Sequence, residues 1–405
     1  MNPIKLKNGL TLFLDEDTRF NTVSISYIIK SGAFDEKGYN KGIAHLIEHI
    51  IIKSKNNICS DNFSYIDNIG GEYSAETYFN RTRLSINVVK QNYFKALKLL
   101  NESVFSLIID SKIIEIEKSI IKEEIYEIND NPKSSIIIKL NDAMHKKNIN
   151  RQCILGTVES INKITYDEIV KFLTEHYNSE NILIYINGNI NSSEIINYLS
   201  SSSVIRESPL KDVCYKSIIE ENLNFNITKL SRSDLEQSII GWGISIKDYS
   251  IKDYYILELI DSLLFGGMSS RFYKNLREEE ALIYDIYTYN NYMENDAIII
   301  GSISTTNEVY NLIDYIWKQY EDLSLNLVSE DELKKAKMHA KGQFLRILDD
   351  IEQKNFLFSE LIAANMYLDY KIDEKILEVS ANDILKFAIR NFNKKNICFM
   401  IMGKD

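Results

Sequence analysis

The sequence predicts an α+β protein with two homologous domains, each a mostly antiparallel β-sheet packed with helices. Two observations support this fold class. Short apolar segments rich in β-branched residues alternate with longer amphipathic segments along all 405 residues. The same order of helix signal, strand signal and glycine also recurs at a fixed distance in the second half of the chain, which indicates a duplicated domain.

The predicted strands and helices follow from these two kinds of segment. Alternating or continuous apolar runs predict strands at Thr22–Ile29, Arg83–Val89, Ile182–Ile186, Ser238–Ile246, Ala297–Ile303 and Ile397–Ile401. Longer periodic stretches predict helices at Tyr93–Ile108, Ser111–Ile128, Glu308–Leu325 and Glu330–Leu348. A first pair of strands is expected around a turn at Asn8-Gly9.

An internal repeat relates the two halves. Thr165–Phe172 resembles Ser380–Phe387, and Asn181–Gly188 resembles Asn396–Gly403, at one offset of 215 residues (380 − 165 and 396 − 181). Each copy has a Thr or Ser with an acidic residue three positions later, and this pattern predicts the start of a helix. An apolar strand that ends at glycine follows. The shared register predicts a duplicated domain.

The predicted domain boundaries lie around a serine-rich stretch. Ser200–Lys216 contains a run of serines and Pro209, which is typical of a linker. We therefore expect an N-terminal catalytic domain at 1–205 and a linker at 206–219. A C-terminal repeat domain is expected at 220–405.

Composition limits the classes of partner. The chain has 47 Lys and Arg against 58 Asp and Glu, a net charge of −11, which disfavours nucleic-acid binding. No run reaches the roughly 18 apolar residues of a membrane span, so no membrane partner is expected. The four cysteines have no C-x-x-C spacing, which predicts reduced thiols and a cytoplasmic location.

Two of the five histidines lie in one short motif, His45-Leu46-Ile47-Glu48-His49. Positions i and i+4 of a helix share a face, so both imidazoles can reach one metal ion, and Zn²⁺ prefers such ligands. Glu48 can accept a proton from a water that the metal activates. The H-x-x-E-H order is typical of inverzincin peptidases. The alternative is two core histidines beside a surface glutamate.

A catalytic zinc site needs a third protein ligand, and the best candidates lie in an acidic helix. The stretch Glu115–Ile128 contains five glutamates, and Glu117 and Glu124 are seven residues apart, so they share one helix face. The alternative interpretation is an ordinary solvated acidic face. The incomplete two-histidine site favours a ligand from this helix.

These residues resemble the pitrilysin/insulinase-type zinc peptidases (peptidase family M16), in the two-domain branch that includes mitochondrial processing peptidase. In that family HxxEH is followed by a distant glutamate ligand from an E-x6-E pair, and here 74 residues separate His49 from Glu124. The resemblance implies a LuxS/MPP-like fold that forms half of a clamshell. It also implies one Zn²⁺ per chain bound by His45, His49 and Glu124, with Glu48 as general base and Glu117 orienting a ligand.

Other segments resemble the same family. Gly70–Thr77 (GGEYSAET) resembles a GGxxNAxT edge strand that binds extended substrate, which implies substrate contacts by Ser74, Ala75 and Thr77. Ser74 stands where the family usually has Asn, which weakens any inference about substrate preference.

The second half resembles the family without its metal motif. Leu276–Tyr284 resembles LREKRGLAY, which implies that Arg277 and Tyr284 reach the substrate backbone; the alternative is a surface Arg and a core Tyr. At the repeat offset His45 and His49 correspond to Ile260 and Leu264. The C-terminal domain is therefore expected to bind no metal and to contribute to substrate binding.

Three functional hypotheses follow. The leading one is a zinc-dependent endopeptidase that hydrolyses peptides or unfolded segments in an enclosed chamber, as a homodimer or as a heterodimer with an M16 paralogue. The alternative is a non-catalytic structural or assembly subunit of such a heterodimer. A narrower version of the first is a peptide-maturation protease that trims leader peptides.

Overall fold

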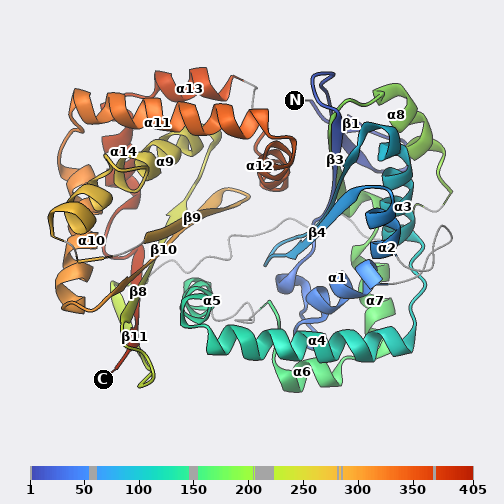
Figure 1. Cartoon of the computed structure of the whole chain (residues 1–405), viewed down its shortest axis with the longest axis horizontal. Coiled ribbons are helices and arrows are strands. Elements are labelled where there is room, and N and C mark those ends of the chain that lie inside the picture. The colour runs from blue at the N-terminus through green and yellow to red at the C-terminus, as the bar shows by residue number, and fades with distance from the viewer. Residues whose placement is uncertain are drawn as a thin grey trace. The chain divides into compact units, whose positions relative to one another are not determined.

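The structure is a computed structural model, and it describes residues 2–53, 62–145, 154–203, 205, 223–280, 282–283, 286–367 and 371–404 (Figure 1). The chain forms two compact units, each made of several segments. The first unit comprises Met1–Glu127, Gln152–Cys214 and Ile347–Tyr367, and the second comprises Ile128–Arg151, Tyr215–Arg346 and Leu368–Asp405. Each unit contains one mixed, mostly antiparallel sheet covered by helices, so the predicted α+β fold class is confirmed.

The sheet of the first unit has six strands in the order β1-β2-β6-β3-β5-β4. These strands are β1 (Ile4–Lys5), β2 (Thr11–Glu16), β3 (Thr22–Ile29), β4 (Gly71–Thr77), β5 (Thr82–Val89) and β6 (Ile182–Gly188). β1 and β2 form the predicted hairpin, in which Gly9 adopts φ +94°. Only β2 and β6 run parallel, and β4 forms one edge of the sheet.

Helices cover both faces of this sheet. The helices assigned to the unit are α1 (Ile43–Lys53), α2 (Asn62–Asn68), α3 (Tyr93–Phe105), α4 (Ser111–Asp130), α6 (Val158–Lys163), α7 (Tyr166–His176), α8 (Ser192–Ser201) and α12 (Ile351–Ala363). On one face, side chains such as Ile25 and Ile86 form an apolar core with α1 and α3. On the other face α12 packs on β3 and β6 through polar contacts, including Asn355 with Asn187 at 2.8 Å.

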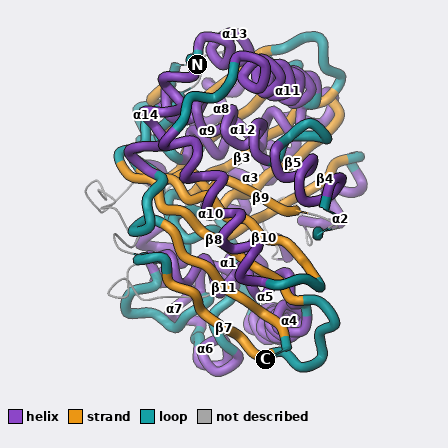
Figure 2. Tube along the Cα trace, turned by 90° about the vertical axis from the view of Figure 1, so that its left-hand side faces the viewer, coloured by secondary structure: helices purple, strands orange, loops and turns teal. Residues whose placement is uncertain are grey.

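The sheet of the second unit has five strands in the order β7-β11-β8-β10-β9. They are β7 (Asn226–Ser231), β8 (Ser238–Lys247), β9 (Ile286–Met293), β10 (Asp296–Thr305) and β11 (Ile397–Gly403). Figure 2 shows β11, β8 and β10 side by side. The helical segments are α5 (Pro132–Met144), α9 (Ile251–Leu264), the π-helix η4 (Tyr273–Glu279), α10 (Val309–Leu325), α11 (Glu330–Asp349), α13 (Ile372–Glu378) and α14 (Ala381–Asn391).

The repeat predicted from the sequence is visible in the hydrogen-bonded structure. The bounds of α7 and α14 differ by 215 residues at both ends (381 − 166 and 391 − 176), and Thr165 and Ser380 form matching capping boxes. The strand register repeats as well, because the pair Thr11 and Leu183 in the first sheet corresponds to Asn226 and Cys398 in the second. The two sheets therefore share one topology.

Two helices pack on the sheet of the other half of the sequence. α5 lies within residues 1–205 but packs on β8, β10 and β11, whereas α12 lies within 220–405 but packs on β3 and β6. Each unit is therefore discontinuous, unlike the continuous ranges expected from the sequence. Glycines at 241 and 243 of β8 leave room for Ile136 and Met144 of α5, which explains this close packing. The expected linker at 206–219 lies outside the described residues.

Candidate metal centre

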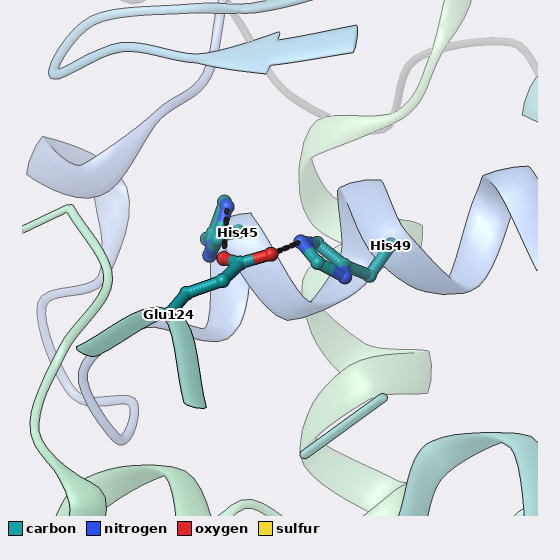
Figure 3. Close-up of side chains that lie close together, drawn as sticks. All are labelled: His45, His49 and Glu124. Atoms are coloured by element: carbon teal, nitrogen blue, oxygen red, sulfur yellow. Dashed lines mark ion pairs between the residues drawn. The ribbon is translucent and has the colours of Figure 1, made fainter. Parts of the chain in front are cut away.

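Helix α1 places two histidines side by side at the surface of the first unit's core. Its apolar residues Ile43, Leu46, Ile47, Ile50 and Ile51 are buried. This apolar stripe holds the helix on the sheet. His45 and His49 lie outside the stripe, with side chains that are 12% and 14% exposed, and both imidazoles are directed toward α4 (Figure 3).

Glu124 of α4 meets both histidines. Its two carboxylate oxygens lie 3.8 Å from Nε2 of His45 and 3.6 Å from Nε2 of His49. One ligand atom from each of the three residues lies within 4.8 Å of the others (Figure 3). Ligand atoms bound to one tetrahedral zinc ion at about 2.0–2.1 Å are about 3.3 Å apart. The separations and the two-nitrogen, one-oxygen donor set therefore fit a zinc ion.

Glu117, two helical turns before Glu124, holds one of the histidines. Its Oε2 lies 3.0 Å from Nδ1 of His49, and the residue is 3% exposed. We assign the Nδ1 proton to this hydrogen bond, which leaves the Nε2 lone pair directed at Glu124. Nδ1 of His45, by contrast, is buried without a hydrogen-bond partner among the residues that the structure describes.

Glu48 lies on the side of α1 that faces the sheet edge. Its side chain is buried, with the residue 5% exposed, and Oγ1 of Thr77 in β4 donates a hydrogen bond of 2.5 Å to its Oε2. This contact engages one oxygen of the carboxyl group. The other oxygen can accept or release a proton next to His49.

The electrostatics of the cluster favour a bound cation. Burial lowers the pKa of His45 to about 3, so its imidazole is neutral at pH 7, as metal binding requires. Burial raises the pKa of Glu48 to about 7, although the Thr77 hydrogen bond opposes this shift. Burial and the nearby Glu117 and Glu127 carboxylates raise the pKa of Glu124, against the effect of His49. A divalent ion would relieve this accumulation of negative charge.

The pKa of His49 is shifted in the opposite direction from that of His45. Burial alone would lower it, but the hydrogen bond to Glu117 and the charges of Glu124 and Glu48 outweigh burial and raise it. These three carboxyl groups therefore stabilise a positive charge at or next to His49.

Strand β4 lies beside this cluster and has no second partner strand among the residues that the structure describes. In the β4–β5 turn the N–H of Tyr78 donates to the carbonyl of Arg81. Because backbone groups alternate in direction along an antiparallel pair, those of Tyr73, Ala75 and Thr77 point away from β5. The hydroxyl of Ser74 lies 2.7 Å from that of Ser85, within the sheet.

The remaining residues that the sequence singled out belong to the second unit. Arg277 lies on η4, with its guanidinium 4.8 Å from the centre of the Tyr273 ring. Tyr284 lies outside the described residues. Ile260 and Leu264 of α9 are buried apolar side chains. They offer no metal ligand at the positions that correspond to His45 and His49.

Sequence reasoning did not anticipate two contacts around α1. The strand motif predicts that Thr77 binds substrate, and its hydroxyl donates a hydrogen bond to Glu48. Glu36 was not singled out, although its carboxyl group accepts hydrogen bonds from the first turn of α1. No local pattern indicates either contact, because each depends on how a loop or strand is placed beside the helix.

Two family models match the chain. Residues 12–158 match the model described as Insulinase (Peptidase family M16), and residues 163–339 match the Peptidase M16 inactive domain. The two matches follow one another along the chain and together cover most of it.

Known proteins agree with this assignment. A Rickettsia bellii protein described as an uncharacterized zinc protease is 28% identical, over 97% of this chain and 95% of its own. The beta subunit of the Dictyostelium discoideum mitochondrial-processing peptidase is 26% identical over 265 residues, which are 64% of this chain and 56% of that one. A crystal structure of a Helicobacter pylori protease has the same fold, with a TM-score of 0.89, 20% identity and 99% of each chain covered. The family that the sequence motifs indicated is thereby confirmed, and the chain belongs to peptidase family M16.

Proposed function

We propose that this protein is a zinc-dependent endopeptidase that hydrolyses peptides or unfolded protein segments. The observation that carries the proposal is the convergence of His45, His49 and Glu124 within 4.8 Å, beside the buried carboxyl of Glu48. The names of the relatives support it, because several are described as zinc proteases. We propose one Zn²⁺ per chain, held by these three side chains.

The roles of the surrounding residues follow from their contacts. Zinc in this site would supply Lewis-acid polarisation of a carbonyl and a water molecule of lowered pKa. Glu48 would act as the general base that accepts a proton from the attacking water and returns it to the leaving amine, with one of its oxygens held by the hydroxyl of Thr77. Glu117 keeps the His49 ring oriented through Nδ1.

An extended substrate is proposed to add to the free edge of β4. Backbone groups of Tyr73, Ala75 and Thr77 point to that edge, and main-chain pairing of this kind tolerates many sequences. Side-chain selectivity would then come from neighbouring surfaces. The hydroxyl of Ser74 is engaged with Ser85, so a substrate contact by Ser74 would require that pair to open.

The contributions of the second repeat and of partner chains are proposed from the family resemblance. Arg277 and Tyr284 would contact the substrate backbone. Two chains would enclose a chamber, as a homodimer or with an M16 paralogue, and one relative is itself named a peptidase subunit. The scattered cysteines support a cytoplasmic location. None of the described helices is long and apolar enough to cross a bilayer.

The second candidate is a non-catalytic subunit that has kept the fold. The match of residues 163–339 to an inactive-domain model favours a supporting role for that region. A non-catalytic role for the whole chain would leave the cluster around Glu124 without a function. A dedicated role in trimming leader peptides is a narrower form of the first proposal, and broad cleavage of unrelated peptides would contradict it.

The test combines zinc content with cleavage of a mixed peptide library. We expect one zinc per wild-type chain and cleavage of peptides in the library. Glu48→Gln should keep the metal and lose at least about 100-fold in turnover. Glu124→Gln should lose the metal, whereas Glu123→Gln should behave as wild type, because Glu123 is exposed on the neighbouring position of α4. A wild-type protein that binds zinc but cleaves nothing, alone or with a paralogue, would favour the non-catalytic subunit. A protein without zinc affinity would overturn the proposal.

A further inference from the structure

The helix that carries His45 and His49 begins at a residue that cannot cap it. The carbonyl of Gly42 accepts the first intrahelical hydrogen bond, from the N–H of Leu46 at 2.9 Å. Gly42 has φ +85°, and a Cβ at this position would lie 2.5 Å from the carbonyl oxygen of Leu155. The usual capping residues Ser, Thr, Asp and Asn are therefore excluded here. The free N–H groups of the first turn need another acceptor.

Glu36 supplies that acceptor from the preceding loop. Its Oε1 accepts hydrogen bonds of 3.1 Å from the N–H groups of both Gly42 and Ala44, and its Oε2 lies 3.1 Å from the same Gly42 nitrogen. The residue is 0% exposed. A buried side chain six positions upstream thus performs the capping that the glycine cannot, at the positive end of the helix dipole.

The position of this carboxyl group is unfavourable for its charged form. Burial raises the pKa of Glu36 to about 8, although the Ala44 and Gly42 N–H groups and the charge of Lys41 act in the opposite direction. Nζ of Lys41 is buried, with no hydrogen-bond partner among the residues described. Burying polar groups such as these costs free energy unless they form hydrogen bonds, and the carboxyl group of Glu36 forms its hydrogen bonds with the first turn of α1.

Two other contacts hold the loop before α1, but neither involves the N–H groups of the first turn of the helix. The side chain of Asn40 donates to Glu168 at 2.9 Å, and the hydroxyl of Ser160 donates to the carbonyl of Lys41 at 2.8 Å. Among the residues that the structure describes, only Glu36 accepts a hydrogen bond from the N–H of Ala44, the residue that directly precedes His45. The bond from Glu36 thus reaches α1 one residue before His45.

We propose that Glu36 is a positioning residue for the metal site, which holds the first turn of α1 so that Nε2 of His45 is directed at Glu124. This inference rests on the proposed zinc function. It assigns to Glu36 a direct effect on metal affinity, in addition to any effect on the stability of the fold. The effect on metal affinity would arise from Oε1 of Glu36, which accepts hydrogen bonds from the N–H groups of both Gly42 and Ala44.

The test compares two substitutions of similar size. Glu36→Gln keeps an Oε1 acceptor, whereas Glu36→Met fills the same space without any acceptor. Asn191→Ala is the matched control, because the Asn191 side chain caps α8 in the same unit by accepting from the N–H of Glu194 at 3.2 Å. The measurements are amide hydrogen exchange at residues 42–46 in metal-free protein, thermal stability, and the zinc dissociation constant by chelator competition.

We expect Glu36→Met to exchange faster at 42–46 and to bind zinc about tenfold more weakly or worse. Glu36→Gln should lie between wild type and Glu36→Met. Asn191→Ala should lose thermal stability but keep the wild-type zinc affinity. The inference is overturned if Glu36→Met binds zinc within twofold of wild type, or if Asn191→Ala weakens zinc binding as much. A wild-type protein that binds no zinc would instead overturn the proposed function, and metal-free exchange would still report whether Glu36 caps α1.

Discussion

The hydroxyl of Thr77 donates a hydrogen bond of 2.5 Å to Oε2 of Glu48. This bond joins the edge strand β4, on which we propose that substrate adds, to the helix that carries the candidate metal ligands. Strand and helix are 29 residues apart in sequence at these positions. This hydrogen bond therefore fixes the position of Glu48, the proposed general base, relative to β4, the proposed substrate strand.

Removing this hydroxyl should reduce turnover without affecting metal binding. Thr77→Val keeps the shape and the strand preference of the residue but leaves Oε2 of Glu48 without its donor. We expect kcat to fall about tenfold, the equivalent of about 1.4 kcal/mol, because a hydrogen bond to a charged group is lost. Zinc content should stay at the wild-type level. Thr77→Ser, which retains the hydroxyl, is the control, and equal turnover of the Val and Ser variants would contradict the expectation.

The Glu117 carboxylate should set zinc affinity through His49. Glu117→Gln preserves shape but removes the charge that accepts the Nδ1 proton at 3.0 Å. We expect zinc to bind about 10- to 100-fold more weakly, measured by chelator competition. Glu115→Gln is the matched control on the same helix, because Glu115 is 71% exposed and pairs with Lys118. Similar zinc affinities for the two variants would argue against this role.

The core of the second unit should not tolerate a methyl group at position 301. A Cβ on Gly301 of β10 would collide with the indole ring of Trp242, which is 0% exposed. We expect Gly301→Ala to lower the free energy of unfolding by about 1–3 kcal/mol. Gly342→Ala, inside α11, has no Cβ neighbour closer than 3.5 Å and should raise it by about 0.5–1 kcal/mol. Urea denaturation of both variants tests the contrast.

Acid should destabilise the second unit through His145. The residue is 1% exposed, and burial lowers its pKa to about 4 from the usual value of 6.5. The unfolded chain then binds more protons than the folded chain between about pH 6.5 and pH 4, so stability is lost as the pH falls through that range. We expect a loss of about 2 kcal/mol between pH 7 and pH 5 relative to His145→Gln.

Denaturation curves at the two pH values measure this difference. The Gln side chain can still donate to the carbonyl of Asn141, as the histidine ring does at 2.6 Å. The two proteins therefore differ mainly in the titrating group. Parallel loss of stability in both proteins would assign the acid sensitivity to other residues.

Local sequence patterns predicted the elements and their repeat well. The structure has β3 at Thr22–Ile29, the bounds predicted for that strand, and α10 begins one residue later than predicted and ends at Leu325 as expected. The capping boxes at Thr165 and Ser380 lie where the offset placed them. These features depend on neighbours within a few residues, so a single sequence carries enough information to predict them.

The candidate site was only partly accessible from the sequence. The spacing of His45 and His49 places them on one helix face whatever the fold, so their convergence could be predicted. The nearness of Glu124, by contrast, was inferred from family resemblance, because helix periodicity does not say which helices meet. The contacts of Thr77 and Glu36 with α1 had no sequence signal, because they join separate segments across a strand and a loop.

By itself, the sequence determined many of the helices and strands, the duplication and the histidine pair, because these follow from periodicity and spacing within short segments. Only the tertiary structure decided that α5 and α12 each pack on the sheet of the opposite half, and that a loop glutamate caps the helix of the candidate ligands. An amphipathic helix specifies that one face must be buried, but many apolar or polar surfaces can bury it. The surface that does so is decided by how all the segments pack together.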